Sequence, residues 1–425
     1  MKRFFGLVLA VVLLAGAFVW GFATERFRIF PMPLIHRAAV VLGKRWDNSV
    51  ELTSPSPALA ALKSLPYLNG SVDPNAKAMG VLVNERGAVA PGVNFFSTLG
   101  SRGEACLVDN DGKELWRWSL SREFPPAALR PGIAFGYTHL FPNGDVLAFV
   151  DGLAVVKLDK DSRVLWKHVC QAHHDAFVAD DGRIYALVHE TRSVPAISER
   201  YRSLLDAVEV LSPSGERERT ISVFDVLQAS PYAFLLPRTA GLTLDPGTDA
   251  VDVLHTNHVE VYDGSLEKLS PLFRRGNLLL SMRDLNTIAI VDGATSQVLW
   301  AWGPTNLSLQ HHPTILGDGN VLLFDNGTSL SQIVEVDPRT NAVTWRYAPA
   351  KDFYTEILGA CQRLPNGNTL ATLSQKGYAR EVTPDGRVVW EFANPSVGNG
   401  GFRNGIYRMT RYPETALPFL GSPAP

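Results

Sequence analysis

This chain of 425 residues has few cysteines and no marked excess of either positive or negative charge. The three cysteines, Cys106, Cys170 and Cys361, lie far apart, and neither a CxxC pair nor a Cys/His zinc spacing occurs. A disulfide framework or a zinc site is therefore not expected, although one long-range disulfide stays open. The formal net charge is -2 and no basic run occurs, which argues against nucleic-acid binding.

Turn formers and apolar residues, by contrast, are plentiful. The chain holds 28 prolines and 35 glycines, and hydrophobic residues make up 46% of it. This composition indicates a globular protein with many short turns and enough apolar side chains for a large core.

The N-terminal stretch is strongly apolar. Two basic residues precede uncharged, mostly apolar residues from Phe4 to Phe22, a run long enough to cross a bilayer as a helix. Positive charge before the run predicts a cytoplasmic N-terminus and an exported body. We therefore expect a transmembrane signal anchor over residues 1–24, with a cleaved signal peptide as the alternative. Residues 25–90 are expected to form a stalk and lead-in with short helices.

From about residue 90 the sequence repeats itself. One marker is a turn followed by an apolar residue and tryptophan, at Trp118, Trp166, Trp300, Trp345 and Trp390. A second marker is an inner turn such as PNGD, DDGR or GDGN between apolar runs, which is typical of β-hairpins. The last three tryptophans are 45 residues apart. A period near 45 with about four short strands per repeat is typical of a β-propeller.

Six units can be counted, at roughly 90–125, 133–170, 171–225, 250–305, 308–350 and 355–395. The segment Phe402 to Tyr412 is expected to complete the first unit and close the ring, since closure removes exposed sheet edges. We therefore predict an all-β, six-bladed β-propeller over residues 91–415, in which the tryptophans pack between blades. Residues 190–250 break the rhythm and are expected to form partly helical insertions on one face.

Histidines recur at matching positions in three successive units. His174 lies eight residues before Gly182, and His311 lies eight residues before Gly319. His255 takes the corresponding place in the fourth unit, ahead of a longer loop. The innermost strand of each propeller blade lines the central channel, so these three side chains are expected to converge on the axis.

Further polar residues are expected beside these histidines. Arg283 follows the same strand in the fourth unit, and Asn257 should face the same side of a strand as His255, two residues before it. Imidazoles, a guanidinium and an amide together suit an oxyanion such as sulfate, phosphate or a carboxylate.

Two chemistries fit such a set of histidines. Three imidazoles could hold a metal ion, but no acidic cluster accompanies them, since Asp175 alternates away from His174 and Asp284 away from Arg283. Alternatively, one histidine acts as a nucleophile for an acyl, phosphoryl or sulfuryl group, and the others stabilise the developing charge. We predict no bound metal and no cofactor.

Several motifs follow one another in a specific order: HTN at His255, then SMRDLN, then QHHPTILGDGNVLLFDNG, with blade turns such as VDGATSQVLWAWG and VTPDGRVVWEF around them. Over about residues 80–412 this pattern resembles the bacterial arylsulfate sulfotransferases. The resemblance implies a six-bladed periplasmic propeller that moves a sulfuryl group from a phenolic sulfate ester to a phenol acceptor. The transfer would pass through a sulfohistidine and need no nucleotide donor.

The resemblance also implies roles for single residues. Catalytic positions are expected at His311, His312, His255, His174 and Arg283, and substrate-binding positions at Asn257, His173 and His139. His311 would be the nucleophile, while the other catalytic residues would bind the sulfuryl oxygens and assist the leaving phenolate. Because His312 stands where the family usually has an acidic or small residue, either histidine of the pair could react.

Two other functions fit the same sequence. A membrane-anchored propeller that does no chemistry would bind a protein partner or a glycan, since propellers often serve as scaffolds. A metal-dependent hydrolase or lyase would use the same histidines. In each case the anchor predicts a single-pass inner-membrane protein with its propeller in the periplasm, where a membrane protein partner could join it.

Overall fold

A computed structural model describes residues 70–99, 103–120, 135–150, 152–236, 243–245 and 250–421. The expected anchor at residues 1–24 and most of the expected stalk lie outside the described residues. Among the residues that are described, no helix is both long and apolar enough to cross a membrane.

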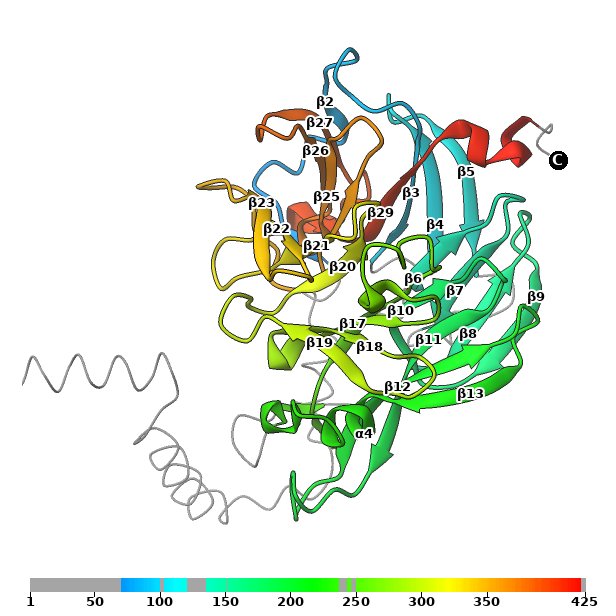
Figure 1. Cartoon of the computed structure of the whole chain (residues 1–425). Coiled ribbons are helices and arrows are strands. Elements are labelled where there is room, and N and C mark those ends of the chain that lie inside the picture. The colour runs from blue at the N-terminus through cyan, green and yellow to red at the C-terminus, as the bar shows by residue number, and fades with distance from the viewer. Residues whose placement is uncertain are drawn as a thin grey trace, which may run out of the picture.

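The chain forms six antiparallel blades arranged in a ring, which confirms the predicted all-β, six-bladed propeller (Figure 1). Blade one comprises β29 (Ile406–Tyr412), β3 (Val93–Thr98), β4 (Glu104–Asp109) and β5 (Glu114–Ser119). Blade two comprises β6 (Phe135–Leu140), β7 (Val146–Val150), β8 (Ala154–Leu158) and β9 (Val164–Val169). Blade three comprises β10 (Ala172–Val178), β11 (Ile184–Arg192), β12 (Ser203–Leu211) and β13 (Arg217–Ser222).

The second half of the ring follows the same plan. Blade four comprises β16 (Thr256–Val261), β17 (Leu278–Met282), β18 (Thr287–Val291) and β19 (Val298–Trp302). Blade five comprises β20 (His311–Ile315), β21 (Val321–Asp325), β22 (Gln332–Asp337) and β23 (Ala342–Tyr347). Blade six comprises β24 (Ala360–Arg363), β25 (Thr369–Leu373), β26 (Tyr378–Val382) and β27 (Val388–Ala393).

A few elements extend this plan. Strand β2 (Gly80–Asn84), within the expected lead-in, adds a fifth strand to blade six by pairing with β27. Strands β14 (Thr243–Asp245) and β15 (Ala250–Asp252) extend blade three, and β1 (Gly70–Val72) pairs with β28 (Phe402–Asn404). The α-helix α4 covers Val223–Gln228. Short 3-10 turns cover Ala233–Leu235, Pro271–Phe273, Arg283–Leu285, Ser374–Lys376, Asn399–Gly401, Glu414–Ala416 and Pro418–Gly421.

The innermost strands meet around the axis. Strands β6, β10, β16, β20, β24 and β29 contact one another in that order, and β29 returns to β6. The inner turns that follow them require glycine. At the turn between β20 and β21, Gly319 has a φ of +87°, and a Cβ there would lie 2.6 Å from the Phe273 ring. The predicted Asp-Gly hairpins therefore set the geometry of the strands that line the channel.

The tryptophans hold neighbouring blades together, as predicted. Their indole N–H groups donate across blade boundaries: Trp118 to Gly144 O (3.0 Å), Trp300 to Asn341 Oδ1 (2.8 Å), Trp345 to Pro384 O (3.0 Å) and Trp390 to Asn110 O (2.9 Å). Each bond joins an outer strand to a turn of the next blade, and the Trp390 bond joins blade six to blade one. The tryptophans are packing residues rather than ligand platforms.

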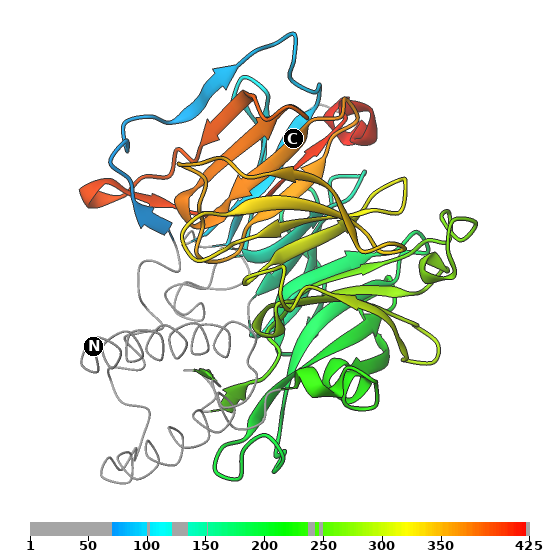
Figure 2. The same ribbon diagram turned by 60° about the vertical axis from the view of Figure 1, so that its left-hand side comes forward.

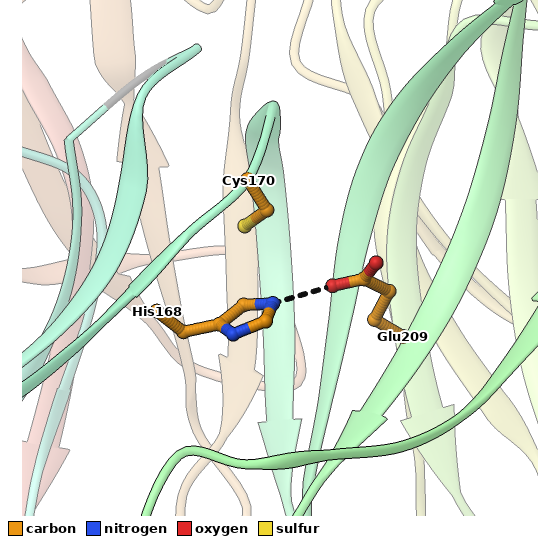
Figure 3. A group of neighbouring side chains, drawn as sticks. All are labelled: His168, Cys170 and Glu209. Atoms are coloured by element: carbon orange, nitrogen blue, oxygen red, sulfur yellow. Dashed lines mark hydrogen bonds and ion pairs between the residues drawn. The ribbon is translucent and has the colours of Figure 1, made fainter.

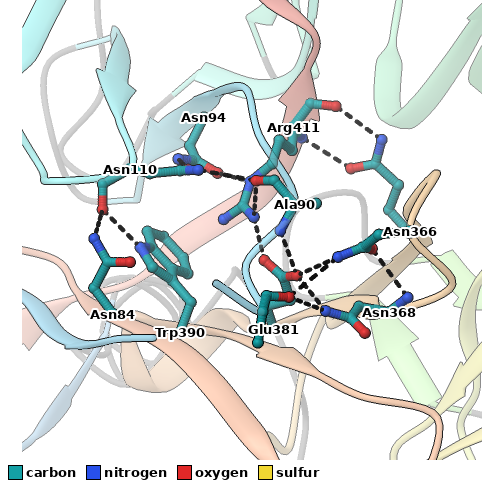
Figure 4. Close-up of polar contacts among 11 residues, drawn as sticks. Asn84, Ala90, Asn94, Asn110, Asn366, Asn368, Glu381, Trp390 and Arg411 are labelled. Atoms are coloured by element: carbon teal, nitrogen blue, oxygen red, sulfur yellow. Dashed lines mark hydrogen bonds and ion pairs between the residues drawn. The ribbon is translucent and has the colours of Figure 1, made fainter. Parts of the chain in front are cut away.

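The ring closes through a buried polar network, called here the closure network (Figure 4). The expected closing segment supplies β29, which pairs with β3 of blade one. Arg411 on β29 forms an ion pair with Glu381 of blade six, with side-chain exposures of 1% and 0%. Glu381 also accepts from the Ala90 N–H at 2.8 Å and Asn368 Nδ2 at 2.6 Å, while Arg411 Nε donates to Asn94 Oδ1 at 2.8 Å. These bonds compensate for burying both charges.

The insertions in blade three are less helical than predicted. Residues 190–210 continue β11 and β12 as a long hairpin, which projects beyond the neighbouring blades in green in Figure 2. There Leu204 and Leu205 pair with Thr191 and Glu190 across the two strands, and this cross-strand pairing outweighs the local helical pattern. Helix α4 follows β13, with the Ser222 hydroxyl capping it by accepting from the Asp225 N–H at 3.2 Å.

Candidate active site at the propeller axis

A small pocket, called here the cavity, lies where the inner strands meet. It is lined by His174, Asn257, His311, His312, Leu358, Gly359, Tyr407 and Arg408. The first four of these were predicted as site residues. The predicted residues His255 and Arg283 do not line the cavity but lie next to it, and both bear on the pKa of His311.

The backbone aims the histidines by breaking the strand pattern. His174, His255 and His312 have φ values of 53°, 50° and 49°, in the left-handed region that side chains other than Gly and Asn rarely adopt. The ladders of β10 and β20 shift register across His174 and His312, and that of β16 shifts at Asn257, two residues after His255. Bulges of this kind re-aim side chains, and such strain clusters at functional sites. The expectation that His255 and Asn257 share a strand face was therefore based on a regular strand that does not exist there.

His311 is held as a neutral imidazole with one free nitrogen. Its Nδ1 lies 2.9 Å from the Leu309 carbonyl oxygen and 2.8 Å from Asn326 Oδ1. A carbonyl only accepts, so Nδ1 carries the proton and Nε2 keeps its lone pair. Burial lowers the pKa of His311 to about 3, so the ring is neutral near pH 7.

The neighbouring His312 has the opposite tautomer. The Cys361 N–H donates to His312 Nδ1 at 3.3 Å. Nδ1 must therefore hold a lone pair, and the proton of the neutral ring sits on Nε2. Burial lowers the pKa of His312 well below its ordinary value, and its ring packs edge-on against His258 at 5.1 Å. The two adjacent histidines thus differ in kind: His311 offers a lone pair and His312 offers a donor.

His255 is paired with a carboxylate. Its Nδ1 forms a short hydrogen bond with Asp252, whose other oxygen accepts from the His255 N–H at 3.1 Å. This pairing places the proton on Nδ1 and leaves Nε2 to face other groups, as in the histidine of a His–Asp dyad. The His255 ring lies 4.6 Å from the His174 ring, centre to centre. Two predicted catalytic histidines therefore meet.

The expectation that no acidic cluster accompanies the histidines was wrong. Arg283 Nε donates to Asp284 at 2.7 Å, because Arg283–Leu285 is a 3-10 turn rather than a continuing strand. Asp252, which pairs with His255, is a further acidic neighbour. Asp175, expected to point away from His174, binds Arg408 of the cavity lining at 3.1 Å and forms a short contact with His258.

His174 is connected through His173 to a buried carboxylate. His173 Nδ1 lies 2.9 Å from His174 Nδ1, and His173 Nε2 lies 3.5 Å from Asp206. Asp206 also accepts from His189 at 3.1 Å and from the Thr256 N–H at 2.6 Å. Although burial alone would raise it, these donors keep the pKa of Asp206 below its ordinary value. His173 Nε2 lies at ion-pair distance from Asp206 without a hydrogen bond, and this proximity favours a proton on Nε2, so that His173 Nδ1 accepts from His174 Nδ1–H and His174 Nε2 keeps a lone pair.

The last predicted binding residue, His139, lies apart from this group. It is on β6, with its ring 4.9 Å from the Phe141 ring, and it does not line the cavity. Burial lowers its pKa to about 4. His139 is three residues beyond the position that aligns with the other histidines, and a strand shifted by three residues aims its side chain elsewhere.

Sequence reasoning missed several residues of the site. Arg408 and Tyr407 line the cavity from β29, and Asn326 and Asp206 orient histidines. The motif FDNG contains Asn326, and β29 was expected to be the innermost strand of blade one. That expectation alone could have placed Tyr407 and Arg408 at the axis.

Three groups of His, Cys and carboxylate side chains within the described ranges have ligand atoms close enough to share a metal ion. They are His168 with Cys170 and Glu209, His173 with His189 and Asp206, and Asp252 with His255 and Asp284. The three cysteines are free thiols, so the long-range disulfide left open by the sequence does not form.

Comparison with known proteins supports the motif resemblance. The family model described as Arylsulfotransferase (ASST) matches residues 138–395. Solved structures of similar shape include a protein of unknown function from Bacteroides caccae, at 12% identity over 76% of this chain and 99% of that one, with a TM-score of 0.49. Another is BamB from Moraxella catarrhalis, at 14% identity over 74% of this chain and 76% of that one, with a TM-score of 0.35. No curated protein matches. The family match spans more than half of the sequence, and the chain belongs to the arylsulfotransferase family.

Proposed function

We propose that this protein transfers a sulfuryl group from a phenolic sulfate ester to a phenol, through a sulfohistidine on His311 and without a nucleotide donor. The observation that carries the proposal is the state of His311. Its Nδ1 proton is held by Leu309 O and Asn326 Oδ1, its Nε2 has a lone pair, and the ring lines the cavity. A neutral imidazole with a free nitrogen is a competent nucleophile.

In the first half-reaction, His311 Nε2 attacks sulfur, the N–S bond forms and the bond from sulfur to the aryl oxygen breaks. The sulfated ring becomes cationic, and Asn326 Oδ1 and Leu309 O stabilise it through the Nδ1 proton. His312 Nε2–H and Arg408 line the same cavity and are suited to hold the sulfuryl oxygens. The electron pair leaves with the phenolate, which takes up a proton.

His255 is the best candidate for moving that proton. Its dyad with Asp252 matches the arrangement in which a carboxylate orients a histidine that gives and takes protons at Nε2. To protonate the phenolate, His255 must carry a proton on Nε2 as well as on Nδ1 in the first half-reaction; having given up the Nε2 proton, the same nitrogen accepts the proton of the incoming phenol in the second half-reaction. The phenol oxygen then attacks sulfur, the N–S bond breaks and His311 returns to its neutral form. The order is ping-pong because the intermediate is covalent.

The tautomers of His311 and His312 distinguish the two histidines that the sequence left equivalent. His311→Ala is expected to lower transfer from p-nitrophenyl sulfate to phenol by on the order of 10⁴-fold, because the nucleophile is lost. His312→Gln keeps a donor and should lose about 10²-fold or less. Mass spectrometry of protein quenched with donor alone should find one sulfuryl group on the peptide that contains His311.

The result that overturns the proposal is equally direct. If His311→Ala retains acceptor-dependent nitrophenol release, or if the sulfuryl group is found on His312 in the unmodified chain, His311 is not the nucleophile. Circular dichroism of each variant checks that the propeller is intact.

We also propose that the protein is held in the inner membrane with its propeller in the periplasm. The support is the apolar run from Phe4 to Phe22 with basic residues before it. Fractionation of cells and protease treatment of spheroplasts test this. A chain that is recovered in the soluble fraction at its full length contradicts the anchor.

A non-catalytic binding role has one observation in its favour. The long β11–β12 hairpin projects from blade three and offers a surface that sulfuryl transfer does not need. Absence of turnover and of a labelled histidine with any phenolic donor would favour this second function.

A further inference from the structure

Of the three groups of potential metal ligands, one has no part in the active site. His168 lies near the end of β9, the outermost strand of blade two, and Cys170 follows two residues later. Glu209 projects from β12 of blade three, and the three side chains converge between the two blades (Figure 3). Their ligand atoms all lie within 4.8 Å of one another. None of the three lines the axial cavity.

We propose that His168, Cys170 and Glu209 bind a zinc ion, or another divalent metal that prefers mixed nitrogen, sulfur and oxygen ligands. Imidazole, thiolate and carboxylate are the three ligand types that zinc takes in proteins. A thiolate disfavours magnesium and calcium, which prefer oxygen ligands alone. Three protein ligands leave a fourth position for water or another small ligand, on the partly exposed side of the group.

The separation of the first two ligands suits a metal without rearrangement. His168 Nε2 lies 2.8 Å from a carboxylate oxygen of Glu209. Two atoms that each lie about 2.0–2.2 Å from one ion in tetrahedral to right-angled geometry are roughly 2.8–3.5 Å apart. A metal ion would therefore take the place of the proton that His168 and Glu209 now share. The Cys170 sulfur already lies within 4.8 Å of the other two ligand atoms, so it has only a short distance to move when the ion binds.

The carboxylate is already held as metal ligands commonly are. One oxygen of Glu209 faces His168, and the other accepts from Arg217 at 3.2 Å. The Glu209 side chain is only 9% exposed, so both oxygens need partners. Ligating carboxylates are usually fixed by such an outer hydrogen bond. Arg217 can keep its oxygen while the metal takes the other.

The charges and protons balance on binding. Without metal, burial and the nearby Glu209 raise the pKa of the Cys170 thiol to about 12, so it is protonated at neutral pH. On binding, the thiol proton leaves to solvent, and His168 ligates through the lone pair of Nε2. The two anionic ligands then offset the double positive charge of the ion. A neutral centre in a half-buried place carries little desolvation cost.

The other two groups are poor metal sites. The rings of His173 and His189 stack in parallel at 3.6 Å with an angle of 1° between them. Imidazole lone pairs lie in the ring plane, so two stacked rings cannot both point at one ion. In the third group, the Arg283 guanidinium binds Asp284 and occupies the place of a cation.

A metal here would join blade two to blade three near their outer rim. The site would act on stability rather than on sulfuryl transfer, because it does not reach the cavity. It is independent of the proposed enzymatic function, and the two can fail separately.

Cobalt(II) is the probe that tests the site, because its bond to a thiolate gives a near-ultraviolet charge-transfer band. The full-length chain without a histidine tag is treated with chelator, desalted under reducing conditions and titrated with Co²⁺, then with Zn²⁺. We expect one equivalent to give the band, and Zn²⁺ to abolish it. Cys170→Ser should lose the band, and Arg217→Ala should weaken Co²⁺ binding by about 10–100-fold.

Two controls make the result decisive. Cys106→Ala removes a buried thiol of blade one and should keep both the band and the affinity. His189→Gln removes a member of the stacked pair and should do the same. The proposal is overturned if the unmodified chain shows no band and no rise in melting temperature with Zn²⁺. It is also overturned if Cys170→Ser binds cobalt as tightly as the unmodified chain.

Discussion

The closure network and the axial histidine cluster are both buried and polar, and both involve β29, but they differ in how their groups are satisfied. Around Arg411 and Glu381, opposite charges pair directly and amide groups bond most of the remaining positions, Arg411 Nη2 excepted. The rings of His174, His255 and His311 are each bonded at Nδ1, and Nε2 is the nitrogen left for other groups. The first arrangement holds the ring closed, whereas the second leaves atoms available for a substrate.

The backbone differs in the same sense. Neither Arg411 nor Glu381 has a positive φ, although Glu381 borders a bulge, whereas His174, His255 and His312 all have positive φ. Strained backbone of this kind costs of order 1–3 kcal/mol per residue and persists only where surrounding structure imposes it. A propeller needs the closure network to fold, but it has no structural need for three strained histidines. The comparison therefore assigns stability to one region and chemistry to the other.

Breaking the closure network should give the largest change in stability. Arg411→Met leaves the Glu381 carboxylate buried without its cation, which costs about 3–5 kcal/mol of unfolding free energy. Denaturant unfolding followed by tryptophan fluorescence measures it. Arg86→Met is the matched control, because Arg86 and Asp111 are 79% and 58% exposed, and such pairs contribute about 0–1 kcal/mol. Equal losses in the two variants would mean that closure does not depend on the buried pair.

Disturbing the axial cluster should instead lower activity. Asp206→Asn presents an amide N–H to one side of this group, so either His189 together with His173, or the Thr256 amide, loses its acceptor. The tautomers of His174 and the position of His255 then change, and kcat should fall on the order of 10²-fold with little change in KM. Asp206 acts through other residues, so the pH profile of kcat should also shift. Asp292→Asn, in an exposed turn of blade four, is the control.

The pH profile of kcat and the unfolding midpoint together separate a positioning role of Asp206 from a merely structural one. If Asp206→Asn loses activity and stability together, while the remaining activity keeps the original pH profile, Asp206 is merely structural. If the pH profile moves while the unfolding midpoint stays, the connection from Asp206 to the catalytic histidines is established.

Lowering the pH should reduce the unfolding free energy through buried His311, which is neutral in the folded chain. The closure network contains no histidine. Burial lowers the pKa of His311 from 6.5 to about 3. Between these values the unfolded chain binds a proton that the folded chain does not, so stability is complete above pH 6.5 and falls as the pH drops toward 3. The slope per residue reaches about 1.4 kcal/mol per pH unit. His311→Gln should flatten the decline between about pH 6 and 4.5, as measured by denaturant unfolding at each pH. An unchanged slope in His311→Gln would show that His311 is protonated when folded.

The fold could be predicted from the sequence because its signals are local and repeated. An Asp-Gly turn such as that at Gly319 and an outer tryptophan such as Trp390 recur with a near-constant period, and each has a direct physical meaning. The ring closure by β29 followed from the same logic, since an incomplete first unit leaves an unpaired edge. The long hairpin of blade three was missed because helical and strand patterns compete there and cross-strand pairing decides between them.

The site could be predicted only in part. The register of the inner turns brought His174 and His311 to the axis, because blades repeat in space as they do in sequence. The partners Asp206 and Asp252 could not be found in this way, since their approach to histidines depends on bulges and on the packing of blade three against blade four. The tautomers of His311 and His312 depend on single backbone contacts, and no sequence pattern carries that information.

The smallest expected effect concerns the indole N–H hydrogen bonds by which tryptophans link neighbouring blades. One of these bonds is buried and another is exposed. Trp118 is fully buried, and its N–H bond to Gly144 O leaves that carbonyl without a donor in Trp118→Phe, a loss of about 1–3 kcal/mol. Trp345 makes the same kind of bond to Pro384 O at an exposed place, where water replaces the indole, so Trp345→Phe should cost about 0.5 kcal/mol or less. Thermal unfolding of the two variants measures the difference. If both variants lose the same stability, the indole side chains contribute through packing and their hydrogen bonds add nothing measurable. The closure network and the apolar packing between blades then hold the ring together.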